Sequence, residues 1–163
     1  MPRSSFSIEE VLSLLAETPT RIATLTDGLA PAQLRTAPGP DEWSANDVLA
    51  HLRSCADMWG GYMMRILAED RPTIWVVNPR AWIKQTDYPA LEFAPSLRAF
   101  TTQRAALLAD LGLLPPEGWA RMATVTGAGS PLERTTLDYA NRLARHEQPH
   151  IKQIERIARS MRG

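Results

Sequence analysis

The sequence is poor in the residues and motifs that carry covalent or redox chemistry. Its 163 residues contain a single cysteine, Cys55, which excludes an intrachain disulfide framework. Glycine-rich phosphate-binding loops, a G-x-S-x-G nucleophile motif and a C-x-x-C motif are all missing. Without these motifs, the sequence gives no support to a nucleotide-binding enzyme, a serine hydrolase or a dithiol oxidoreductase.

The chain also lacks an excess of charge and a long apolar run. Lys plus Arg and Asp plus Glu each number 18, whereas a nucleic-acid-binding protein normally shows a basic excess. No stretch approaches the roughly 18 apolar residues that a membrane span needs, and two glutamates near the N-terminus argue against a signal peptide. With 44% hydrophobic residues, we expect a single cytoplasmic domain over residues 1–163, with neither a nucleic-acid nor a membrane partner.

Helical periodicity is the main positive signal. Capping boxes, in which Ser or Thr precedes an acidic residue by three positions, begin at Ser7, Ser44 and Thr135. Each is followed by apolar residues spaced by three and four, and a further helix is predicted over residues 96–111. Pro19 should kink or split the first helix. The pattern predicts an all-α fold, a four-helix bundle.

Proline-rich stretches separate these helices. Residues 29–40 and 70–95 are predicted to be long irregular connections, and residues 75–77 and 122–125 are weak strand candidates. The second connection carries several aromatic residues, which could roof a substrate pocket, form a dimer surface or cover the ends of the bundle. These aromatics are Trp75, Trp82, Tyr88 and Phe93.

All three histidines fall on predicted inward faces. His146 and His150 lie one helical turn apart on the last helix, and His51 lies on the stripe of the helix that opens at Ser44. Three imidazoles from facing helices would bind a divalent metal and leave a coordination position open, as catalytic zinc sites do. Buried histidines are more often ordinary core residues, so spacing alone leaves both readings open. Cys55, one turn beyond His51, is predicted to be a core residue or a wall of the metal pocket.

The string from His146 to His150 also matches H-E-x-x-H, in which Glu147 would be the general base of a zinc protease. Three observations disfavour this alternative. Pro149 interrupts the motif, a third downstream ligand is missing, and a helical bundle has no edge strand to hold a peptide. Asp47, one turn before His51, could support a metal ligand, but its position in the capping box favours a cap.

Three segments resemble the DinB-like superfamily (damage-inducible DinB and bacillithiol transferases). They are LRTAPGPDEWSANDVLAHLRSCADMW, RILAEDRP and TTLDYANRLARHEQPHIKQIERI, and they occur in the family's order. The resemblance implies an up-down-down-up four-helix bundle, a homodimer, and a metal site of His51, His146 and His150 holding Zn²⁺ or Ni²⁺. Pro149, between two of these ligands, departs from the family pattern and could widen their geometry.

Two functional hypotheses follow from the sequence. The first is a metal-dependent enzyme on a small-molecule substrate, either a thiol-dependent S-transferase that uses a low-molecular-weight thiol or a hydrolase. Only the resemblance places thiol transfer ahead of hydrolysis. The second is a non-catalytic small-ligand-binding or stress-response protein.

Overall fold

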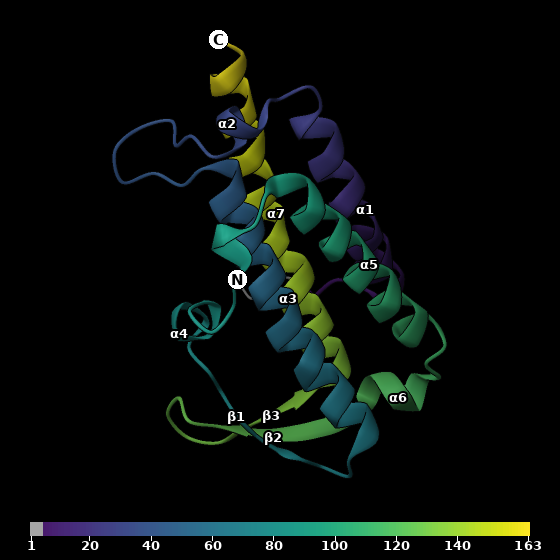
Figure 1. Ribbon diagram of the computed structural model, residues 1–163. Helices are drawn as coiled ribbons and strands as arrows, with labels where there is room; N and C mark the ends of the chain where they lie inside the picture. The colour runs from purple at the N-terminus through teal and green to yellow at the C-terminus, as the bar shows by residue number, and fades with distance from the viewer. Residues whose placement is uncertain (1–4) are drawn as a thin grey trace.

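Within residues 5–163, which this computed structural model describes, four long helices form the bundle. Figure 1 shows α1 and α7 running upward and α3 and α5 running downward, which is the up-down-down-up connectivity that the resemblance implies. Helix α7 packs between α1 and α3, and α5 packs against the same two helices. The predicted four-helix bundle is confirmed. The helices are α1 (Ile8–Thr26), α3 (Ala45–Ala68), α5 (Phe93–Gly112) and α7 (Thr136–Arg162).

All three predicted capping boxes form. In each box the hydroxyl accepts from the backbone N–H three residues on, and the acidic side chain accepts from the backbone N–H of the cap residue. Such a cap stabilises a helix by about 1 kcal/mol. The pairs are Ser7 with Glu10, Ser44 with Asp47, and Thr135 with Asp138. Asp47 therefore acts in the capping box with Ser44, as its position predicts.

The prolines disturb the helices less than their positions predict. Helix α1 continues through Pro19, so it is not split there, and α7 continues through Pro149. Helix α5 begins at Phe93, earlier than predicted, with Pro95 in its first turn. A missing N–H has no helical partner to lose in a first turn, which is why proline is tolerated there.

The connections hold short elements and a small sheet at one end of the bundle (Figure 1). Strand β1 pairs in parallel with β2, with Thr73 opposite Thr124, and β2 pairs antiparallel with β3, with Met122 opposite Thr135. The two weak strand candidates correspond to β1 and β2, but β3 was not predicted. These elements are α2 (Pro31–Leu34), β1 (Thr73–Trp75), α4 (Pro79–Ile83), the 3-10 helix η1 (Tyr88–Ala90), α6 (Pro116–Ala120), β2 (Met122–Thr126) and β3 (Leu132–Thr135).

The core fills the space between the four long helices and extends to the sheet. Leu15, Leu52 and Leu143 are fully buried in the bundle, and Ile74, in strand β1 of the sheet, is fully buried as well. Among the described residues, none of the helices has the length and apolar character to span a bilayer.

Candidate metal centre and adjoining cavity

The three histidine rings lie together between α3 and α7. The ring centroids of His51 and His146 are 4.9 Å apart, those of His51 and His150 are 4.8 Å apart, and those of His146 and His150 are 4.7 Å apart. The Nε2 atoms of His51 and His146 approach to 2.9 Å. The structure thus brings together all three histidines that the sequence singles out.

The antiparallel packing of α3 against α7 explains this convergence. The two helices run in opposite directions, so inward residues three or four positions apart on α3 face inward residues three or four positions apart on α7. The facing residues form pairs, one from each helix, along the contact. The first two pairs hold the histidines and the cysteine, and the next two hold aromatic and arginine side chains. The paired residues are His51 with His150, Cys55 with His146, Trp59 with Arg142, and Tyr62 with Tyr139.

The environment keeps two of the imidazoles in the form that binds metals. Burial, together with charge repulsion from His150, lowers the pKa of His51 to about 4. Burial, with charge repulsion from His150, His51 and Arg142, lowers the pKa of His146 to about 3. Both rings are therefore neutral at pH 7 and offer an unprotonated nitrogen.

Cys55 lies close to the histidines. Its Sγ lies 3.8 Å from each ring nitrogen of His51, and the donor atoms of Cys55, His51 and His146 all lie within 4.8 Å of one another. Burial raises the pKa of the thiol to about 11, so the sulfur is protonated at neutral pH. Cys55 is thus a buried core residue that also lies beside the histidine rings, and its role as a wall of a metal pocket stays a prediction.

Neighbouring side chains orient and cover the rings. Gln153 Oε1 lies 2.8 Å from Nδ1 of His150, so that nitrogen can carry the ring proton and leave Nε2 unprotonated. The ring of Trp43 is stacked on His150 with centroids 6.2 Å apart and meets His51 edge-on at 5.2 Å. Trp59 contacts His146 at 4.8 Å from the other direction. Trp43, 42% exposed, lies at the boundary between the histidines and solvent.

The residues present fit a divalent metal by their chemistry. Two nitrogens on one tetrahedral zinc ion at its usual bond length lie roughly 3.3 Å apart, close to the separation of the Nε2 atoms of His51 and His146. Nδ1 of His146 is buried and has no hydrogen-bond partner among the described residues. Buried polar atoms without partners are rare, but this one lies on the other side of the ring from Nε2, so an ion shared by the two Nε2 atoms would not reach it.

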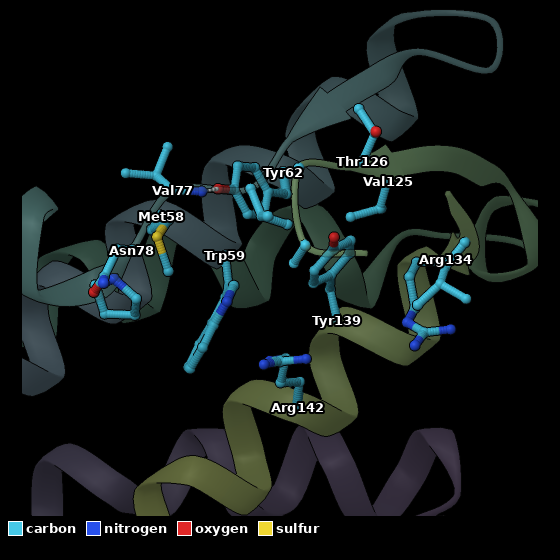
Figure 2. Close-up of a pocket in the computed structure, with 15 residues that line it drawn as sticks. Met58, Trp59, Tyr62, Val77, Asn78, Val125, Thr126, Arg134, Tyr139 and Arg142 are labelled. Atoms are coloured by element: carbon cyan, nitrogen blue, oxygen red, sulfur yellow. Dashed lines mark hydrogen bonds between the residues drawn. The ribbon is translucent and has the colours of Figure 1, made fainter. Parts of the chain in front are cut away.

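A cavity of about 550 Å³ adjoins the histidines at the sheet end of the bundle. Its aromatic wall consists of Trp59 and Tyr62 from α3 and Tyr139 from α7, and Figure 2 shows these rings and Arg142 around a shared space. The rings of Tyr62 and Tyr139 are 5.4 Å apart. Trp59 contacts both His146 and this space, so its ring lies between the cavity and the histidines, none of which lines the cavity.

The connection at residues 70–95 shapes this cavity through residues other than its aromatics. It contributes Val76, Val77, Asn78 and Pro79 to the wall, whereas its aromatic side chains lie elsewhere. Those aromatics are Trp75, which is 69% exposed, Trp82 and Phe93, which pack on the core, and Tyr88, which donates to Asp57. Of the three alternatives for these aromatics, a roof over this cavity is not supported, because the helices supply its aromatic wall.

Residues 14–154 match the family model of the DinB superfamily. The chain belongs to the DinB superfamily. A solved structure, YfiT from Bacillus subtilis, is similar over 99% of this chain and 93% of its own, with a TM-score of 0.81 and 21% sequence identity. YfiT is described as "a probable metal-dependent hydrolase with an unusual four-helix bundle topology", and at this identity the likeness shows the fold. No functionally curated protein matches the chain.

In this DinB-superfamily chain, Glu147 of the H-E-x-x-H string points away from the histidines. It is fully buried, accepts from Thr18 Oγ1 at 2.9 Å and from Arg104 Nη1 at 2.9 Å, and pairs with Arg104 Nη2 as well. The same Nη1 also donates to the carbonyl of Leu15. Glu147 therefore ties α7 to α1 and α5, and the zinc-protease alternative loses its general base.

Sequence reasoning missed several side chains around this DinB-type site. Spacing could have found two of them, because Arg142 lies one turn before His146 and Gln153 lies three residues after His150. Trp43 gives no periodic signal, since it precedes the helix that carries His51.

Proposed function

We propose that this DinB-superfamily protein is a divalent-metal-dependent enzyme whose ligands are His51, His146 and His150. The convergence of three imidazole rings beside a 550 Å³ cavity is the observation that carries the proposal. Three protein ligands leave a position open for a reacting group, and cavities of this volume accommodate small organic molecules. The description of YfiT as metal-dependent agrees with this assignment.

A divalent ion held there would lower the pKa of a water or thiol at its open position. The protein's own groups favour a thiol as the nucleophile. No Asp or Glu belongs to the described donor cluster, and Glu147 is paired with Arg104. A thiol needs less help than water to lose its proton, because its ordinary pKa is near 8.5. Thiol S-transfer is therefore our first candidate, with Zn²⁺ or Ni²⁺ and a low-molecular-weight thiol as cofactors.

Hydrolysis is the second candidate, supported by the description of YfiT. The two reactions separate cleanly in an assay of metal-loaded protein. With a chlorinated nitroaromatic, S-transfer forms a carbon–sulfur bond, breaks the carbon–chlorine bond and releases chloride and the thiol proton. Hydrolysis instead cleaves an ester or amide without added thiol. Turnover in neither assay, with metal bound, would favour the non-catalytic small-ligand-binding or stress-response alternative.

Thermal unfolding tests the metal site directly. A metal that binds the folded chain at a free concentration 100 times its Kd stabilises it by about 2.7 kcal/mol, which for a domain of this size raises the Tm by roughly 5–11 °C. We expect this increase with Zn²⁺ or Ni²⁺ in protein purified without a histidine tag and stripped by a chelator. Elemental analysis of the protein before stripping identifies the ion.

The histidines must account for this increase. His150→Ala should abolish it, whereas Lys152→Ala, an exposed substitution on the same helix, should leave it unchanged. An equal increase in wild type and His150→Ala would refute the assignment. The homodimer and the cytoplasmic location stay predictions, and light scattering of the purified protein tests the first of them.

A further inference from the structure

We propose that the cavity beside the metal centre binds an organic carboxylate, with the carboxylate held by Arg142 and Arg134 and an apolar body on the aromatic wall. This inference rests on the proposed function for its catalytic context and names the substrate class. The inference is drawn first from the charged residues that line the cavity.

The cavity has a positive wall although the whole chain is neutral. Arg134 and Arg142 line it, and no Asp or Glu does. Neither guanidinium forms an ion pair within the part of the chain that the structure describes. Arg134 Nη1 donates to the backbone carbonyl of Glu133, and Arg142 lies over the ring of Trp59 at 5.5 Å. Both retain N–H donors, and guanidinium groups pair with carboxylates through two parallel hydrogen bonds.

The rest of the wall suits an apolar body that carries one polar end. Met58, Val76 and Val125 line the cavity together with the aromatic rings. The hydroxyl of Tyr62 accepts from the backbone N–H of Val77 at 3.2 Å, which leaves its own proton available to donate. The polar groups around the cavity are thus rich in donors, the arrangement that favours an anion over a cation or a neutral amine.

Arg142 lines the cavity on the side of the histidines. It is one helical turn before His146 on α7, and its guanidinium lies over the ring of Trp59. Figure 2 shows Arg142 opposite Trp59, the residue that also contacts the ring of His146. A carboxylate paired with Arg142 would therefore fix one end of a substrate within reach of the histidines.

Binding to metal-free protein tests this proposal separately from the metal assignment. Calorimetric titration compares 3-phenylpropionate with 3-phenylpropanamide, which has nearly the same shape but no charge. We expect the carboxylate to bind about tenfold more tightly, the ratio that corresponds to one charge-assisted hydrogen bond. Added salt should weaken binding of the carboxylate and leave binding of the amide nearly unchanged.

Substitution of the arginines, singly and together, identifies the contact. Arg142→Met and Arg134→Met each retain most of the side-chain volume and should each lose part of the tenfold preference. The double variant should bring the carboxylate to the affinity of the amide. Arg98→Met, at an exposed position of α5 outside the cavity, should preserve the tenfold preference. Equal binding of the two probes to wild type, no binding of the carboxylate, or an equal loss in Arg98→Met and in the double variant would overturn the proposal. These results do not depend on whether a metal raises the Tm, so the two proposals can fail separately.

Discussion

The buried ion pair between Arg104 and Glu147 gives the sharpest prediction for stability. Their side chains are 2% and 0% exposed, and the pair connects α5 to α7. Thr18 and the carbonyl of Leu15 add hydrogen bonds from α1, whereas Nε of Arg104 has no partner among the described residues. Glu147→Gln removes the charge and leaves the guanidinium buried without a counter-ion. Breaking such a pair on one side destabilises a protein by about 3–5 kcal/mol, because the remaining charge stays desolvated.

The measurement is urea unfolding of the metal-free protein, followed by circular dichroism. We expect Glu147→Gln to lose about 3–5 kcal/mol, equivalent to a Tm decrease of roughly 6–20 °C. The double variant Arg104→Met/Glu147→Gln should recover most of this loss, since no uncompensated charge stays buried. Glu155→Gln breaks an exposed pair with Arg159 on the same helix and should change stability by less than about 1 kcal/mol.

A loss below about 1 kcal/mol in Glu147→Gln would refute this account. Additive losses in the double variant would do the same, because they would show that the two charges do not depend on each other. The same variant tests the role of Glu147 in the site. Its metal-dependent increase in Tm should match that of wild type, whereas loss of the increase would show that Glu147 contributes to metal binding.

Further predictions concern three other positions. Pro149→Ala replaces a proline inside α7 with the best helix former and should stabilise the protein by about 1–3 kcal/mol in urea unfolding; a lower stability would show that the proline is required. Burial, with Asp57 as partner, raises the pKa of Tyr88 to about 12, so the folded chain holds this proton more tightly than the unfolded chain. The free energy of unfolding should therefore fall from about pH 10 to pH 12, and should fall less in Tyr88→Phe. Because burial raises its pKa to about 11, Cys55 should resist an aromatic disulfide reagent at pH 8 in folded protein and react fully in urea; rapid reaction without urea would show that it is accessible.

Local rules were enough to predict most of the fold. The capping boxes at Ser7, Ser44 and Thr135 depend on residues three positions apart, and they begin three of the long helices as expected. The inward stripes likewise placed His51 and the two histidines of the last helix on facing surfaces. The family resemblance supplied the connectivity, which the periodicity of separate helices does not determine.

Features that depend on distant residues could not be predicted in this way. Strand β3, Leu132–Thr135, has no apolar alternation and forms because β2 offers it a partner. Arg104 follows Phe100 by one turn on the inward face of α5. A search for apolar residues does not select a buried arginine, and its partner Glu147 is distant in the sequence. The cavity draws on the helices, the sheet and a connection at once, so no single stretch of sequence contains it.

The position of the proposed metal ligands along the chain has a consequence for the order of assembly. His51 and His146 are 95 residues apart, and their rings meet only when α3 and α7 pack in the correct register. In a folding intermediate in which α7 has not docked, the site would be divided, with one histidine on α3 and two on α7. The ion would therefore join late, after the slow search for long-range contacts, and would slow unfolding without accelerating folding.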